Sequence, residues 1–165
     1  ERLDEPFEIH ENIIIPKADH RFGTLSFLVF SNRGRKISGN ISYQIGNFFG
    51  GTRRRLSFES GVKASGRLSF KASTEFNKVK LPGGDFATYR LGNKVLYSFT
   101  PALFVRGVIQ LNSKTEIVGG NFLLSYQFAP GSDFFFVYNH AWDTKSGLRQ
   151  LNRSFQLKLS YFWKP

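Results

Sequence analysis

The sequence predicts an all-β fold, and within that class an antiparallel transmembrane up-and-down β-barrel of about ten strands, either complete or part of a larger barrel. Three observations predict it. Apolar and polar residues alternate in runs of roughly ten residues, the length that a tilted strand needs to cross a bilayer. Turn residues end most of these runs. Aromatic residues make up 16% of the chain, with 19 Phe and 6 Tyr, which is rich for a soluble domain.

Residues 95–139 show this alternation most clearly. Within them Leu103 and Ile109 fall on one side of an extended chain, while Arg106 and Gln110 fall on the other. One face is therefore apolar and the other mostly polar. The same alternation occurs in soluble sandwiches and in lipocalin-like barrels, so periodicity alone leaves a soluble fold open.

Length and composition limit the remaining possibilities. The 165 residues suffice for one domain, so we expect a single domain over residues 1–165, with the charged residues 1–6 as a lead-in tail. With no Cys there is neither a disulfide nor a cysteine metal site. The net charge of +11 favours anionic partners. No apolar run is long enough for a membrane-spanning helix, and the start at Glu1 indicates a processed or excised piece.

Each expected strand ends at a recognisable turn. Residues 7–15 form a weak first strand closed by Pro16, and residues 21–31 a second with apolar residues on both faces. Ser65 and Gly66 predict a tight hairpin, and residues 78–86, with Pro82 and two glycines, predict the longest mid-chain loop. Residues 143–152 predict a long polar loop before the last strand. The ten expected strands cover residues 7–15, 21–31, 36–46, 56–63, 67–77, 87–99, 102–112, the run around 122–128, 133–142 and 153–164.

The connections differ in length according to their position in this order. Those after the even-numbered expected strands are short, and those after the odd-numbered ones include the long or glycine-rich ones. Outer-membrane barrels have short periplasmic turns and longer outer loops. The pattern therefore predicts a bacterial outer-membrane location with both termini in the periplasm.

Four segments resemble a known family. They are GNFFGGTRRRLS (46–57), LPGGDF (81–86), TPALFVRGVIQLNS (100–113) and, most specifically, SYQFAPGSDFFFVYN (125–139). From about Phe7 onward the chain resembles the C-terminal barrel region of large bacterial outer-membrane proteins of unknown function that carry a family-nine carbohydrate-binding-like domain before the barrel. The resemblance implies an outer-membrane barrel and no known reaction. The chain departs from the family in lacking that domain and in ending in WKP rather than in an aromatic residue.

The alternation sorts the candidate site residues into three groups. Residues on the polar face are expected to line the lumen: Arg55, Glu59, Lys63, Lys71, Glu75, Arg106, Gln110 and Lys158. Residues on the apolar face are expected to contact lipid: Leu103, Ile109, Phe155, Leu157, Leu159, Tyr161 and Trp163. A basic group in two neighbouring loops is expected to contact phosphates of lipopolysaccharide, or else to be an ordinary solvated surface: Arg53, Arg54, Lys78 and Lys80.

Catalysis and metal binding have little support in the sequence. His140 and Asp143 could form a hydrolytic dyad, but no nucleophile motif and no third group accompany them. The histidines lack metal-ligand spacing. We therefore predict no catalytic residue, no metal and no cofactor.

The leading functional expectation is an integral, porin-like outer-membrane protein that serves as a scaffold or as a passage for small solutes. Its expected partners are outer-membrane lipid, lipopolysaccharide, and other chains or missing strands of the same barrel. Nucleic acid is not expected, because the aromatic residues lie opposite many of the cations. In a barrel of about ten strands, ion pairs across a narrow lumen would close it, whereas a larger barrel would favour conduction. The alternatives are a soluble barrel that binds an apolar or anionic small molecule, and a hydrolase with its site at the rim.

Overall fold

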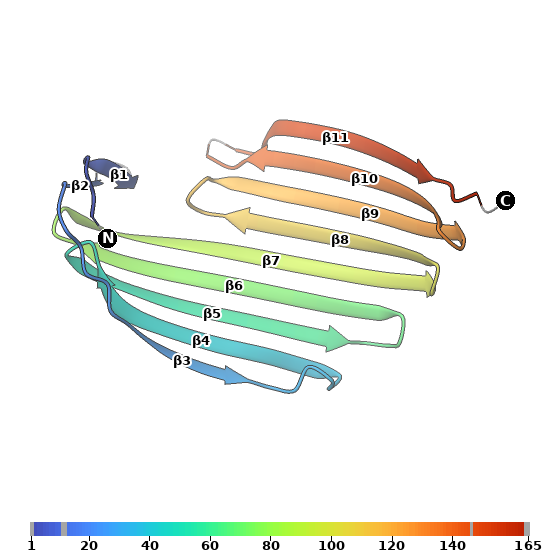
Figure 1. The fold of residues 1–165 in the computed structure, drawn as a ribbon, viewed down its shortest axis with the longest axis horizontal. Helices are drawn as coiled ribbons and strands as arrows, with labels where there is room; N and C mark the ends of the chain where they lie inside the picture. Colours follow the sequence, from blue (N-terminus) through green and yellow to red (C-terminus); the bar gives the residue numbers. More distant parts are fainter. Residues whose placement is uncertain (1, 11–12, 146, 164–165) are drawn as a thin grey trace.

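The computed structural model describes residues 2–10, 13–145 and 147–163, which form an all-β fold. Nine antiparallel strands make the main sheet and follow one another in chain order from β3 to β11, while β1 and β2 form a separate hairpin (Figure 1). The predicted antiparallel up-and-down topology is confirmed. The strands are β1 (Phe7–His10), β2 (Ile13–Ile15), β3 (Thr24–Phe30), β4 (Ile37–Phe48), β5 (Gly51–Lys63), β6 (Leu68–Leu81), β7 (Gly84–Thr100), β8 (Leu103–Asn112), β9 (Ile117–Ala129), β10 (Ser132–Asp143) and β11 (Arg149–Ser160).

Each strand from β4 to β11 is long. The shortest, β8, has 10 residues and the longest, β7, has 17. A tilted strand needs about 9–11 residues to cross a bilayer. Every strand of this group therefore has at least that length, while β3, with 7 residues, is shorter.

The N-terminal region differs from the expectation of one strand. Residues 7–10 and 13–15 instead form two antiparallel strands, β1 and β2, with Phe7 opposite Ile15. Ile13 and Ile15 pack against Val79 and Leu81, which makes the only buried hydrophobic cluster of the described residues. This hairpin thus covers one end of the sheet instead of extending it (Figure 1).

Two expected loops are wrong. β6 continues to Leu81 and β7 begins at Gly84, so the mid-chain loop shrinks to residues 82–83. Pro82 lacks an N–H group, but it lies in the turn, where no N–H group is needed for a ladder hydrogen bond. Gly84 adopts a φ of 144°, a conformation that favours glycine. At the other end of the sheet order β11 begins at Arg149, within the expected polar loop, and ends at Ser160.

These boundaries also overturn the predicted asymmetry of the connections. The turns at residues 49–50 and 82–83, expected to be on the long side, are as short as those at 101–102 and 130–131. With nine strands in the main sheet, the start of β3 and the end of β11 lie at opposite ends of the sheet (Figure 1). The two ends of the described sheet therefore do not lie on one side, and the periplasmic location of both termini stays a prediction.

The strands at the two edges are β3 and β11. Each pairs with a single neighbour, and the described residues show no ladder between them. All seven side chains of β3 are exposed, as are most of those of β11. Within the part of the chain that the structure describes, the outer side of each edge strand therefore has no ladder partner.

Candidate functional site: the two faces of the sheet

The register separates the side chains of the main sheet into two faces. In an antiparallel ladder directly paired residues lie on the same face, and successive residues alternate. Phe122 pairs with Gly107 and Tyr138, and Tyr138 pairs with Phe155, so these positions share one face. We call it the apolar face, and we call the opposite one the polar face.

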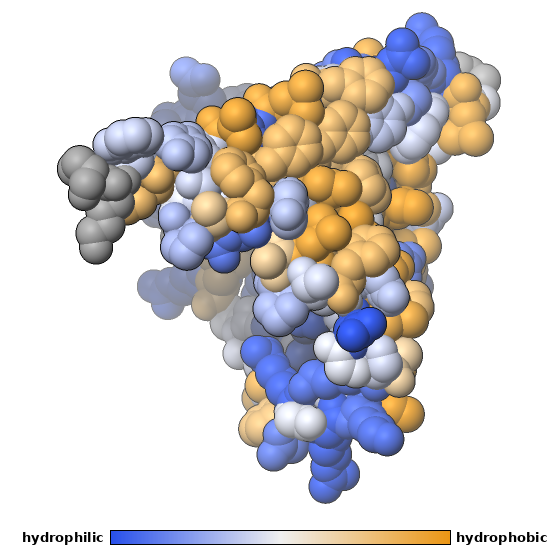
Figure 2. All heavy atoms as spheres, turned by 90° about the vertical axis from the view of Figure 1, so that its right-hand side faces the viewer, coloured by the Kyte–Doolittle hydropathy of each residue, from blue (hydrophilic) through white to orange (hydrophobic). Residues whose placement is uncertain are grey.

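Many large hydrophobic side chains on the apolar face are exposed, while those of β10 are half-buried. The exposed fractions of Phe27, Ile109 and Leu157 are 57%, 59% and 70%. Figure 2, which looks onto the end of the molecule that lies to the right in Figure 1, shows hydrophobic residues gathered at the surface of that end. Exposed apolar patches of this extent mark a surface that contacts lipid or another protein.

The predicted lipid-facing residues fall into two groups. Leu103, Ile109, Phe155, Leu157 and Leu159 share the apolar face through the ladders from β7 to β11. Tyr161 and Trp163 follow the end of β11, and their exposed fractions are 68% and 72%. Their expected place in the last strand is therefore wrong.

Aromatic rings gather where the apolar face approaches the β7–β8 and β9–β10 turns. Tyr97 and Phe99 form a T-shaped pair with ring centroids 4.8 Å apart, and Tyr126 and Phe128 form a second pair at 6.3 Å. Tyr carries a polar hydroxyl on an apolar ring, which suits a boundary between oil and water. The pairs resemble part of the aromatic girdle of a membrane barrel.

The opposite end of the apolar face carries cations. Arg54 lies directly opposite Lys78, and Lys80 lies opposite Thr52 and Asp85, so the three cations follow the apolar band on the same face. They belong to β5 and β6, not to loops as expected. Arg53 was expected to lie with these three cations, and this is wrong. It lies on the polar face, with its guanidinium 4.6 Å from the Phe48 ring centroid.

All eight predicted lumen residues lie on the polar face. Arg55 pairs with Gln44 and Asn77, and Glu75 pairs with Ser57 and Arg90. The other members follow by the same alternation: Glu59, Lys63, Lys71, Arg106, Gln110 and Lys158. The alternation of polar and apolar residues in the sequence therefore predicted correctly that these eight residues share one face. It does not give the position of a metal or a ligand.

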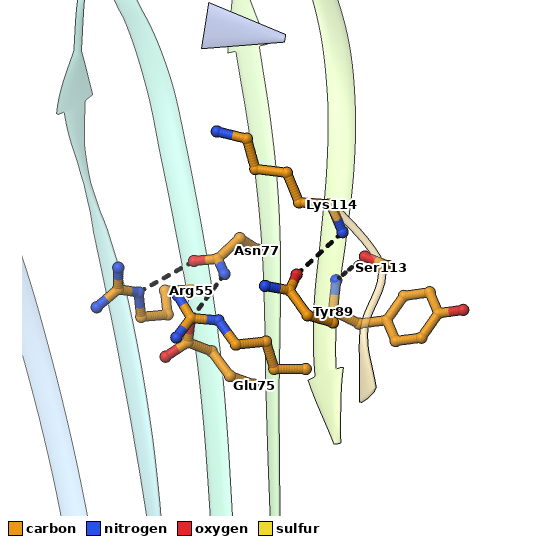
Figure 3. A network of polar contacts seen from close by, with 8 residues as sticks. Arg55, Glu75, Asn77, Tyr89, Ser113 and Lys114 are labelled. Atoms are coloured by element: carbon orange, nitrogen blue, oxygen red, sulfur yellow. Dashed lines mark hydrogen bonds and ion pairs between the residues drawn. The ribbon is translucent and has the colours of Figure 1, made fainter. Parts of the chain in front are cut away.

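One polar network spans three strands of that face (Figure 3). Arg55 Nε donates to Asn77 Oδ1 at 3.0 Å, and Asn77 Nδ2 donates to Glu75 Oε1 at 3.0 Å. A nitrogen of Arg90 lies 3.7 Å from the same Glu75 oxygen. In Figure 3 the ring of Tyr89 points away from this group, as the alternation requires. The network holds β5, β6 and β7 together through side chains as well as through the backbone.

A second polar group on this face has no counterpart among the predicted site residues. Asn121 Nδ2 donates to Asn139 Oδ1 at 2.6 Å, and Asn139 Nδ2 donates to Ser154 Oγ at 3.2 Å. Together with Gln110 and Asn152, Asn121 and Asn139 line a shallow depression of about 260 Å³. In the sequence, Asn121 and Asn139 each occupy a polar position of an alternating run. Only the register of β9 and β10 places the two side by side.

The possible His140–Asp143 dyad is not assembled. His140 lies on the apolar face, 2.7 Å from the Tyr138 hydroxyl and stacked on Trp142 at 3.9 Å between ring centroids. Asp143 lies on the polar face, 3.6 Å from Arg149. A base and its orienting carboxylate need hydrogen-bond contact, which opposite faces of one strand do not permit.

Other features add no chemistry. The described residues contain no group of three His, Cys, Asp or Glu side chains that could hold a metal ion. Among the same residues, no helix is long and apolar enough to cross a bilayer. Comparison of the chain with protein-family models, curated proteins and solved structures finds no match.

Proposed function

We propose that the chain is an integral outer-membrane β-barrel protein that serves as a scaffold or as a passage for small solutes, without catalysis. The observation that carries the proposal is the exposed apolar face opposite a polar one. Burial of apolar area stabilises a protein by roughly 25 cal/mol per Å². A sheet that leaves Phe27, Leu157 and Leu159 uncovered gains that stabilisation only where hydrocarbon covers them.

The backbone supports the same proposal and adds a condition. In hydrocarbon every N–H and C=O group must be paired within the protein. The free edges of β3 and β11 therefore require either a ladder with one another or strands from another part of a longer protein or from another chain. In each case the polar face lines the interior and the apolar face meets lipid.

The basic end of the apolar face suits an outer membrane. Arg54, Lys78 and Lys80 lie beyond the apolar band, where cations meet the phosphates of lipopolysaccharide or of another anionic lipid. Aromatic pairs lie toward the opposite end. The resemblance to the barrel region of proteins with a family-nine carbohydrate-binding-like domain supports this location.

The two other functions have weaker support. A soluble barrel that binds a small molecule inside must enclose the apolar side chains, yet Leu157 and Leu159 are each 70% exposed. A hydrolase at the rim needs His140 and Asp143 on one face, and they lie on opposite faces.

Folding into vesicles tests the proposal. The purified chain is diluted from urea into phospholipid vesicles, floated on a density gradient, and run on a gel with and without heating. We expect flotation with the vesicles and a mobility shift between heated and unheated samples, which reports a closed, detergent-resistant barrel. A folded protein that remains in the aqueous fraction without lipid or detergent would contradict the proposal.

A further inference from the structure

Charge is unevenly distributed over the polar face. The basic side chains on it outnumber the acidic ones. The basic ones are Arg53, Arg55, Lys63, Lys71, Arg90, Lys94, Arg106, Arg149 and Lys158, and the acidic ones are Glu59, Glu75, Asp133 and Asp143.

The carboxylates are engaged or lie at the ends of strands. Glu75 is held by Arg90 and Asn77, and Asp143 by Arg149. Glu59 accepts a hydrogen bond from Asn40 Nδ2 at 3.0 Å. Asp133 lies at the start of β10. Glu75 and Asp143 are therefore already paired with arginines, whereas Glu59 keeps its charge one diagonal step from Lys71.

Three cations occupy the middle of the face, and we call them the central basic cluster: Lys71, Lys94 and Arg106. Lys63 is the last residue of β5, and its Nζ donates to the Arg33 carbonyl oxygen at 3.0 Å. Lys71 lies directly opposite Lys94, and their other ladder neighbours are Gly61 and Val108, so no carboxylate lies directly opposite either one. Directly opposed Cβ atoms are about 4.5–5.5 Å apart, and like charges there destabilise the sheet. An anion between the two ammonium groups removes that repulsion.

Arg106 adds an independent observation. It lies opposite Leu96, one diagonal step from Lys94. Its Nε atom is buried and has no hydrogen-bond partner among the described residues. A buried donor without an acceptor costs roughly 1–3 kcal/mol, so this nitrogen favours an acceptor from outside the chain. Lys71 is exposed and Lys94 is half-buried on the same face, so a solute can reach the cluster from the side of Lys71.

We infer that the central basic cluster is a binding site for small anions and makes the passage selective for them. The inference rests on the proposed passage function and names its solute class. Several cations on one lining concentrate anions and exclude cations. The ammonium groups act as strongly hydrated point charges, which suits small inorganic anions such as chloride and phosphate.

Reversal potentials in planar bilayers of neutral lipid, under a potassium chloride gradient, test the inference. The wild-type chain is expected to pass chloride in preference to potassium. In Lys71→Glu/Lys94→Glu the permeability ratio of chloride to potassium is expected to fall by roughly tenfold or more. The control, Lys78→Glu/Lys80→Glu, changes the net charge by the same amount on β6 but on the opposite face, and should leave the ratio unchanged.

The possible outcomes separate the two proposals. Conductance without anion preference, or an equal shift in both double variants, overturns the inference and leaves the passage standing. Absence of any conductance from the folded wild-type chain overturns the passage and the inference with it. If the Glu variant fails the gel-mobility test of folding, Lys71→Gln/Lys94→Gln is used in its place. That variant removes the charge without reversing it and should bring the ratio closer to one.

Discussion

Leu157 lies directly opposite Phe136 in the β10–β11 ladder, while its sequence neighbours Gln156 and Lys158 lie opposite Val137 and Phe135 on the other face. Leu157 is 70% exposed. A residue of this kind has no partner within the described chain that could cover it. The sheet is therefore amphipathic, with an exposed apolar face opposite a polar one.

A charge on either face of β11 should have opposite consequences. Leu157→Arg places a guanidinium on the apolar face, which costs about 2–4 kcal/mol at the middle of a bilayer. We expect a decrease of that size in the free energy of unfolding, measured by urea titration in vesicles. Gln156→Arg, one residue away on the polar face, should change the free energy little. Equal losses in both variants would contradict the assignment of faces.

The start of β5 depends on a close approach between two backbones. A Cβ at Gly51 would overlap the carbonyl oxygen of Lys80 and lie 2.9 Å from Leu81 Cα. Gly51→Ala should therefore lower the free energy of unfolding by about 1–3 kcal/mol, the usual range for overpacking. Gly107→Ala is the control, since no atom lies within 4 Å of its added Cβ. A folded, equally stable Gly51→Ala protein would show that the β5–β6 register differs.

The N-terminal hairpin should be held by two buried side chains, Ile13 and Ile15. Ile15 is 2% exposed and packs in the cluster with Val79 and Leu81, whereas Ile14 is 62% exposed. Ile15→Ala should weaken the hairpin by about 2–5 kcal/mol. Hydrogen exchange of the β1–β2 amides should accelerate in Ile15→Ala and not in Ile14→Ala, with the β8–β10 amides unchanged. Similar exchange in both variants would show that the hairpin does not dock through Ile15.

His140 should have a structural role. His140→Ala removes the stack on Trp142 and the contact with the Tyr138 hydroxyl, which together should cost about 0.5–1.5 kcal/mol of stability. Hydrolysis of ester, peptide and phospholipid substrates should be the same with and without the substitution. Hydrolysis that disappears in both His140→Ala and Asp143→Asn would restore the hydrolase hypothesis.

Much of the sheet could be predicted from the sequence because its signal is local. Alternation with a period of two appears within each strand, so Arg106 and Ile109 could be assigned to opposite faces without knowing any neighbour. The eight residues predicted to line the lumen share the polar face for this reason. The same applies to the antiparallel meander, since short turns connect successive runs.

The remaining features depend on partners distant in sequence. The residues around Pro82 contain turn formers, yet Arg53 and Lys80 extend the β5–β6–β7 ladders almost to the turn. The sequence of residues 7–15 resembles an edge strand. In the structure, however, Ile13 and Ile15 pack against Val79 and Leu81, which are distant in sequence. The Asn121–Asn139–Ser154 group exists only through the register of three strands.

Accessibility along β11 tests the central claim most directly. The chain contains no Cys, so single cysteines can be placed at positions 155–160 one at a time and spin-labelled after folding into vesicles. The labels at 155, 157 and 159 should collide mainly with oxygen dissolved in the lipid, and those at 156, 158 and 160 with a water-soluble nickel complex. The reverse pattern, or labels at 155, 157 and 159 that neither reagent reaches because protein encloses them, would contradict the account.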